Sequence, residues 1–186
     1  MADNTDLNRK ILVAGQGGKT TLARALAADL DLPHIELDAI YWLPNWGERP
    51  VDEFRERVHG ALDSNPAGWV ADGNYGGHLE GMVARQAETV INVNMPWRLL
   101  FWRTLRRSIA RARDKKIICG ENVETWRKAF FSRDSLLWFL IKNRQGITGR
   151  RPAQLRAWAK GAQMIEVTGR AALNRFYEDR GLVRGE

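Results

Sequence analysis

The sequence contains a single cysteine, Cys119, among its 186 residues, so an intrachain disulfide and a cysteine-rich zinc site are both excluded. No stretch approaches the roughly 20 consecutive apolar residues that a membrane-spanning helix requires. The first residues also lack the basic start and the apolar run that are typical of a signal peptide. The histidines are scattered, with no metal-binding spacing among them. These absences predict a cytoplasmic protein with no membrane partner, and they leave Cys119 without an assigned role.

The composition that remains is that of an ordinary globular protein. Hydrophobic residues make up 44% of the chain and charged residues 27%, a balance typical of folded rather than disordered proteins. A length of 186 residues suits one domain with a sizeable core and is short for two. We therefore expect a single domain over residues 1–186.

Positive charge is concentrated in one part of the chain. The formal net charge is +7, but residues 98–160 hold 17 basic and four acidic residues and so carry +13. Arginines outnumber lysines by 22 to seven, and planar arginine side chains suit bidentate contact with phosphate. This asymmetry favours a phosphate-bearing ligand or a nucleic acid as partner. Solvated helices whose arginine stems cover apolar surface are the alternative.

Short apolar runs alternate with helical spacings along the chain. The runs predict strands at 11–14, 34–37, 69–71, 89–93 and 163–167. The spacings predict helices at 19–31, 51–63, 79–86, 96–113, 123–142, 153–160 and 170–179, with loops at 38–50 and 143–152. Such alternation indicates an α/β fold, in which helices cover both faces of a five-stranded parallel sheet and ligands bind at the carboxyl ends of the strands.

The turn after the first expected strand has the residue types of a phosphate-binding loop. In such a loop glycines let backbone N–H groups turn toward phosphate, the lysine reaches the outer phosphates, and the hydroxyl after it holds Mg²⁺. We predict that ATP is bound there, with Lys19 also catalytic and Thr20 also a metal ligand; a structural turn without ligand is the alternative. The predicted nucleotide-binding residues of this turn are Gly15, Gly17, Gly18, Lys19, Thr20 and Thr21.

The loop departs from the standard spacing in one respect. The standard pattern places a glycine six residues before the lysine, and Val13 occupies that position here. Counted from Gly15, the loop is two residues short, which removes about 7 Å of chain that could encircle a phosphate. The first strand could yield residues to the loop, but β-branched Val13 would resist the backbone angles that glycine accepts. Nucleotide binding is therefore predicted in kind, while its strength is left open.

Several segments together resemble the P-loop nucleotide kinases of the adenylate-kinase-like group. They are residues 17–23, 32–38, 41–46, 69–75, 102–107 and 132–135. More closely, nearly the whole chain is similar to the bacterial topology modulation proteins, also called adenylate-kinase-related ATPases. The resemblance implies a P-loop NTPase three-layer sandwich with an arginine-rich helical lid, here a lid-like insertion at about 114–152.

The resemblance also implies roles for individual residues. Asp72 corresponds to an acid that holds Mg²⁺ through water, although it could simply open an Asp-Gly turn. Arg103 corresponds to the arginine that stacks on adenine, and Arg107, one helical turn later, faces the phosphates. Arg133 and Arg144 correspond to two arginines that clamp phosphate during transfer. Arg107, Arg133 and Arg144 are thus predicted to be catalytic, and a solvated helix face is the alternative for each arginine.

On the acceptor side the chain differs from adenylate kinases. Those enzymes grip the acceptor phosphate with two arginines, at positions that Tyr41 and Gly76 occupy here, so true adenylate kinase activity is not expected. Asp38 could orient or deprotonate an acceptor hydroxyl, as an acid does in similar small-molecule kinases. The aromatic residues of these loops either stack on a ring of the substrate or form a small core. The predicted substrate residues are Asp38, Trp42, Asn74 and Tyr75.

Three functional hypotheses follow from these patterns. The leading one is an ATP- and Mg²⁺-dependent P-loop kinase, or NTPase, that acts on an unidentified small acceptor. The second is a nucleic-acid-associated regulatory NTPase that uses residues 98–160 as a basic face. The third is a pseudo-kinase in which the shortened loop has impaired ATP binding.

Overall fold

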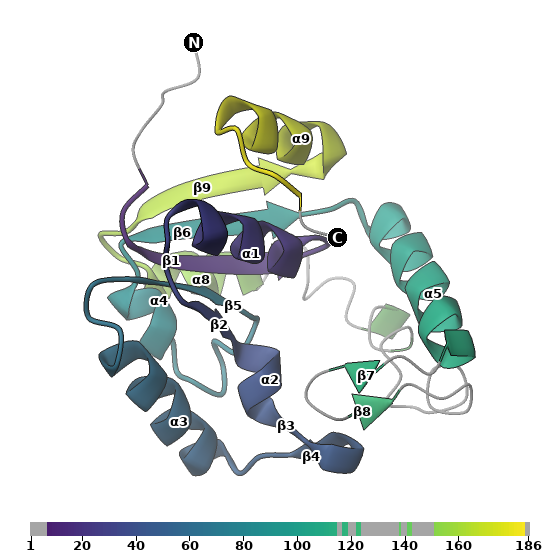
Figure 1. The fold of residues 1–186 in the computed structure, drawn as a ribbon, viewed down its shortest axis with the longest axis horizontal. Helices are drawn as coiled ribbons and strands as arrows, with labels where there is room; N and C mark the ends of the chain where they lie inside the picture. Colours follow the sequence, from purple (N-terminus) through teal and green to yellow (C-terminus); the bar gives the residue numbers. More distant parts are fainter. Residues whose placement is uncertain are drawn as a thin grey trace.

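Five short runs of the chain form one parallel sheet (Figure 1). Its strands are β1 (Lys10–Gln16), β2 (His34–Glu36), β5 (Trp69–Asp72), β6 (Thr89–Asn94) and β9 (Gln163–Thr168). They lie in the order β2-β5-β1-β6-β9, and Val13 of β1 is in register with Asp72 of β5 and with Ile91 of β6. The predicted five-stranded parallel sheet is therefore confirmed, with each strand within two residues of its expected bounds.

The computed structural model describes residues 7–114, 117–118, 122–123, 138, 141–142 and 151–184. Most of the expected lid-like insertion at 114–152, including Arg133, Arg144 and Cys119, lies outside these residues, so the roles predicted there stay predictions. Within the described ranges, every helix is too short or too polar to cross a membrane.

Alternate residues along the strands build two cores, one on each face of the sheet. On one face Ile11 and Val13 belong to a cluster that also includes residues of two helices, and on the other face Leu12 and Trp69 belong to a second cluster beneath four helices. The first two helices are α1 (Lys19–Asp29) and α9 (Gly169–Asp179), and the other four are α2 (Leu37–Tyr41), α3 (Val51–Asp63), α4 (Met82–Gln86) and α8 (Arg151–Trp158). Helices thus cover both faces (Figure 1), which confirms the three-layer prediction.

Helix α5 (Trp97–Asp114) carries much of the positive charge in the described part of the chain. Figure 1 shows it to one side of the sheet. Thr104 and Ser108, one turn apart, are buried, whereas Arg103 and Arg107 are exposed. The contacts of these two arginines with adenine and phosphate therefore stay predictions.

Three expected elements differ from the observed ones by more than two residues, whereas the ends of α1 and α8 differ from the expected ones by two. The expected loop at 38–50 begins with most of α2 and continues through β3 (Trp42–Leu43), η1 (Pro44–Trp46) and β4 (Gly47–Glu48). The expected helix at 79–86 begins only at Met82, because Gly81 before it has a left-handed backbone (φ 76°). The expected helix at 123–142 does not begin at 123, since β8 (Asn122–Val123) pairs there with β7 (Ile117–Ile118).

The loop between β5 and α4 packs directly against α8 through two glycines. A Cβ atom on Gly76 would lie 2.2 Å from Cζ3 of Trp158, and one on Gly81 would lie 2.3 Å from its Cγ. The indole ring therefore fills the space that a side chain at either position would need. Trp158 thus holds this loop over the carboxyl end of the sheet.

The contact with Trp158 predicts that alanine substitutions at two adjacent glycines will differ strongly in their effect on stability. Gly76→Ala should lower the free energy of unfolding by about 1 to 3 kcal/mol, because the added methyl group overpacks against the indole. Gly77→Ala is the matched control, since a Cβ atom there meets nothing within 4 Å. Urea denaturation checks both variants. If Gly76→Ala and Gly77→Ala lowered the free energy of unfolding equally, the packing described would be contradicted. It would also be contradicted if Gly76→Ala were as destabilising in a Trp158→Ala background as in the natural protein.

Candidate functional site

The turn between β1 and α1 is unusually short. Strand β1 continues to Gln16, which is in register with Asn94 of β6, so only Gly17 and Gly18 separate the strand from the helix. Both glycines have left-handed backbones, with φ of 90° and 119°, which other residues rarely adopt. Val13 stays inside the sheet with no exposed surface. The strand therefore does not yield residues to lengthen the loop.

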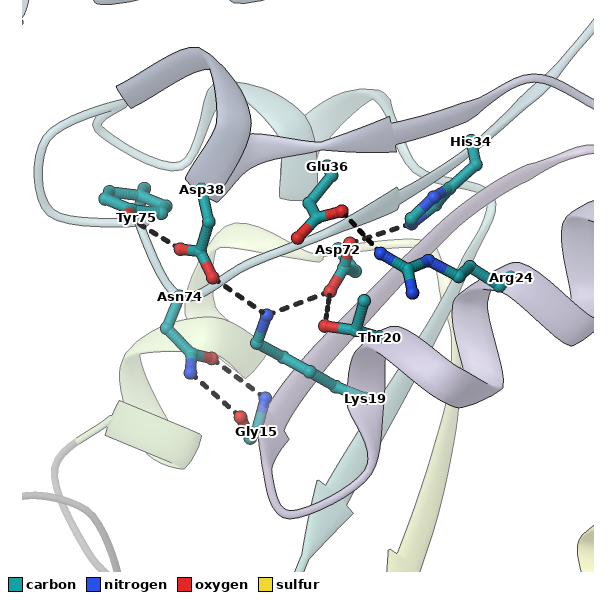
Figure 2. A network of polar contacts seen from close by, with 10 residues as sticks. All are labelled: Gly15, Lys19, Thr20, Arg24, His34, Glu36, Asp38, Asp72, Asn74 and Tyr75. Carbon is teal, nitrogen blue, oxygen red and sulfur yellow. Dashed lines mark hydrogen bonds and ion pairs between the residues drawn. The ribbon is translucent and has the colours of Figure 1, made fainter. Parts of the chain in front are cut away.

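Gly15, at the end of β1, is held by a side chain from another part of the chain. Its N–H donates to Oδ1 of Asn74 at 2.9 Å, and Nδ2 of Asn74 donates to its carbonyl oxygen at 2.8 Å (Figure 2). A Cβ atom on Gly15 would lie 2.1 Å from the carbonyl oxygen of Val93, so the close approach of β6 requires glycine here. One backbone amide that a longer phosphate loop could offer to ligand is thus used inside the protein.

Asp72 is the centre of a charged network at the carboxyl end of β5 (Figure 2). Its Oδ2 atom accepts hydrogen bonds from Nζ of Lys19 at 2.9 Å and from Oγ1 of Thr20 at 2.6 Å, both in the first turn of α1. Its Oδ1 atom lies 2.8 Å from Nε2 of His34 in β2. The carboxylate has no exposed surface, so these three contacts replace the water that it loses on folding.

The contacts of Asp72 decide its charge. Burial alone would raise the pKa of this carboxyl, but the hydrogen bond with His34, the charge of Lys19 and the hydrogen bonds from Thr20 and Lys19 together lower the pKa from 3.8 to about 2. The group is therefore an anion at neutral pH, as a ligand of Mg²⁺ must be.

Asp38 lies beside the phosphate-loop lysine. Its Oδ2 atom is 3.7 Å from Nζ of Lys19, and its Oδ1 atom accepts a hydrogen bond from the hydroxyl of Tyr75 at 2.7 Å (Figure 2). The first turn of α2 positions this carboxylate, which is 33% exposed. Lys19 is thus placed between two carboxylates, one fully buried and one accessible to a ligand.

His34 is the functional contact that the sequence analysis missed. It had no metal-binding spacing and therefore received no role, yet its ring nitrogen contacts Asp72. In β2, His34 and Glu36 lie two residues apart and so point to the same face of the sheet, where Glu36 pairs with Arg24 of α1 at 2.9 Å. The alternation of polar and apolar residues in β2 could have shown that His34 and Glu36 share a face of the sheet. The pairing of β2 with β5, which brings His34 to Asp72, was not visible in the sequence.

The site has groups that fit phosphate and Mg²⁺. The first hydrogen bond within α1 runs from the N–H of Leu22 to the carbonyl of Gly18, so the N–H groups before Leu22 have no partner within the helix and suit an anion. Thr20 and Asp72 offer the oxygen atoms that Mg²⁺ prefers. Two protein oxygens are enough for Mg²⁺, because this ion usually keeps several waters and would take its other ligands from phosphate. Among the described residues no group of three metal-binding side chains occurs.

The structure brings together most of the predicted site residues. Those that lie in or beside the network of Figure 2 are Gly15, Gly17, Gly18, Lys19, Thr20, Asp38, Asp72, Asn74 and Tyr75. Thr21 is exposed in the first turn of α1, and Trp42 lies outside the network. For Thr21 and Trp42 a ligand contact stays a prediction.

The aromatic residues beside the site pack on one another. Tyr41 is only 5% exposed, and its ring centroid lies 5.1 Å from those of Trp42 and Phe54 and 4.8 Å from that of Tyr75. Trp42 in turn contacts Trp46 edge to face. Of the two alternatives for these residues, a small core under the loop is the one that these contacts favour.

The lowered pKa of Asp72 predicts a specific loss of stability in acid. Because the pKa is about 2 in the folded protein and 3.8 without these contacts, the stabilisation is complete above about pH 4 and is lost as the pH falls through 2. The loss amounts to about 2 kcal/mol. Denaturant unfolding between pH 6 and pH 2 should show this loss in the natural protein, and Asp72→Asn should remove it. Asp52→Asn, at a 99% exposed side chain, is the control and should keep the pH dependence of the natural protein. If Asp52→Asn also removed the loss of stability between pH 6 and pH 2, the assignment to Asp72 would be contradicted.

Comparison with known proteins finds a similar fold. No family model matches the chain, and no curated protein matches its sequence. Among solved structures, the shikimate kinase from Acinetobacter baumannii in complex with shikimate is similar at a TM-score of 0.51 and 20% identity, over 91% of this chain and 89% of that one. A sugar kinase from Janibacter sp. HTCC2649, without ligand, gives a TM-score of 0.48 and 17% identity over 92% and 93%. With its five-stranded parallel sheet, the chain has the α/β fold of P-loop kinases such as shikimate kinase.

Proposed function

We propose that the protein is a P-loop phosphotransferase, a kinase that transfers the terminal phosphoryl group of ATP to a small acceptor with the help of Mg²⁺. The observation that carries this proposal is the cluster of Lys19, Thr20 and Asp72 at the start of α1, with Asp38 3.7 Å from the lysine. It combines a cation for phosphate, two oxygen ligands for a metal and a carboxylate that can act as a base.

Lys19 would bind the outer phosphates of ATP. Its ammonium group contacts Asp72 and Asp38, and both carboxylates would remain nearby to orient it. The free N–H groups of the first turn of α1 would add hydrogen bonds to the same phosphates. Mg²⁺, held by Thr20 and Asp72, would neutralise charge that develops on the phosphate oxygens. The predicted contributions of Arg107, Arg133 and Arg144 would be of the same kind.

Asp38 would act on the acceptor. An acceptor hydroxyl at Oδ1 of Asp38 would replace the hydroxyl of Tyr75, which occupies that position now. During transfer, a bond forms between the acceptor oxygen and the terminal phosphorus, the bond from that phosphorus to the bridging oxygen breaks, and ADP leaves. The hydroxyl proton passes to the carboxylate of Asp38.

A nucleoside monophosphate is not the acceptor that we propose. Tyr41 stands where adenylate kinases have one phosphate-binding arginine, and it is buried in the aromatic cluster. Gly76 stands where they have another, and Trp158 fills the space beyond its Cα atom. Neither position can carry a phosphate clamp in this packing.

The other two hypotheses have less support. Exposed arginines on α5 suit a nucleic acid, but they equally suit the lid of a nucleotide kinase, so they do not favour a regulatory role. The pseudo-kinase hypothesis draws on the two-glycine turn and on the use of the Gly15 amide by Asn74. A measurement of ATP binding distinguishes the pseudo-kinase hypothesis from the proposed function.

The first test is calorimetric titration of the protein with Mg²⁺-ATP. We expect micromolar binding by the natural protein, and Lys19→Ala should weaken it by about tenfold or more, because a charge-assisted hydrogen bond to phosphate is lost. Lys160→Ala, at an exposed lysine beyond the end of α8, is the matched control and should bind normally. Absence of binding by the natural protein would overturn the kinase proposal in favour of the pseudo-kinase. Equal binding by Lys19→Ala would remove the lysine from the phosphate site.

A further inference from the structure

A cavity of about 280 Å³ lies on the face of the sheet that α4 and α8 cover. Its floor includes Leu12 and Ala14 of β1, and Leu155 and Trp158 of α8 form part of its wall. The volume is close to the lower end of the range for small-molecule sites. Asp72 itself contacts Lys19 and Thr20 of α1, on the opposite face of the sheet.

The lining of this cavity is unusual for a strongly charged protein. Charged residues make up 27% of the sequence, yet no Lys, Arg, Asp or Glu is among the described residues that line it. Five carboxamides lie there instead, namely Gln16, Asn74, Asn92, Asn94 and Gln154. The cavity therefore combines apolar surface with carboxamides, with the imidazole of His78 and the hydroxyl-bearing ring of Tyr75 also in its lining.

Two of these carboxamides are already bound within the protein. Asn74 holds Gly15, and Asn92 donates to Glu166, which is also paired with Arg156. The side chains of the other three take part in none of the hydrogen bonds that join described residues. Since Gln16 and Asn94 are in register on neighbouring strands, their side chains form a pair of hydrogen-bonding groups at the rim of the sheet, free to meet a ligand.

The cavity adjoins the proposed reaction site. Gly15, Asn74 and Tyr75 belong to its lining and also to the network that surrounds Lys19. Tyr75 contributes its ring to the wall while its hydroxyl donates to Asp38. A molecule in the cavity would therefore lie beside Tyr75, whose hydroxyl it would have to displace to reach the carboxylate of Asp38.

We propose that this cavity binds the phosphoryl acceptor and selects an uncharged small molecule that carries several hydroxyl groups. The inference rests on the proposed phosphotransferase function and specifies the substrate class of the same site. Each carboxamide offers two donors and one acceptor, which suits hydroxyl groups that both donate and accept. Apolar side chains and the indole of Trp158 would cover the carbon framework of the ligand.

Selection against charge follows from the cost of desolvation. A carboxylate or phosphate that enters the cavity loses water, and the described lining offers no Lys or Arg to pair with it, which makes such burial costly. A neutral molecule loses only the water bound to its hydroxyl groups, and hydrogen bonds from the carboxamides offset that loss of free energy. The site therefore separates two molecules of the same shape by their charge.

Saturation-transfer NMR on the full chain, without nucleotide, tests this inference. The probes are D-glucose and myo-inositol, compared with the charged molecules D-gluconate and glucose 6-phosphate. We expect the neutral probes to bind at millimolar concentration or better and the charged ones at least tenfold more weakly. Anionic probes that bind as well as neutral ones, or no binding by any neutral probe, would overturn the proposal.

A pair of isosteric substitutions locates the binding. Asn94→Leu should weaken a neutral probe by about tenfold, because its hydrogen bonds are lost while the shape is kept. Asn174→Leu, on α9 at the opposite face of the sheet, should leave the probe's affinity unchanged. Equal effects of the two variants would place the probe outside the cavity. Because no nucleotide is present, these results stand whether or not Mg²⁺-ATP binds, so a failure of the acceptor site and a failure of the kinase proposal are distinguishable.

Discussion

The buried carboxylate of Asp72 is the constraint on which the rest of the site depends. An ionised group with no exposed surface must be surrounded by donors, and here they come from two separate elements. Lys19 and Thr20 are brought by the start of α1, and His34 is brought by the edge strand β2. The carboxylate thereby connects the turn before α1 to the outer part of the sheet. The same contacts that stabilise the anion also place the lysine and the hydroxyl for a ligand.

The shortened turn before α1 has consequences that reach beyond the turn itself. Because β1 stays paired through Gln16, the chain has only two glycines in which to change direction. The Gly15 amide then faces the loop after β5 and is bound by Asn74. What remains for an anion is the first turn of α1 with Lys19. A site of this kind relies more on the lysine and on the helix N-terminus than on an encircling loop.

Charge is divided between the two faces at the carboxyl end of the sheet. The face of α1 carries the ionised groups around Asp72, as a polyphosphate and a metal require. The face of α4 and α8 carries a cavity whose described lining contains no Lys, Arg, Asp or Glu. Asn74 and Tyr75 separate these spaces, and each bonds into the network while lining the cavity. This division agrees with a donor site and an acceptor site that meet at Asp38.

Local patterns in the sequence were enough to predict the strands, the helix at 51–63 and the glycine-rich turn before Lys19, because apolar periodicity and glycine placement are properties of adjacent residues. The candidates Asp72 and Asp38 came from the resemblance to P-loop kinases. The role of His34 and the packing of Trp158 on Gly76 were beyond such patterns. Both depend on the order in which strands and helices assemble, which brings residues far apart in the chain into contact. The short helix α2 was not predicted for the same reason, since Tyr41 at its end packs against aromatic residues from other parts of the chain. Tertiary packing alone also produced the cavity, because its five carboxamides come from two strands, one loop and one helix whose adjacency no local pattern encodes.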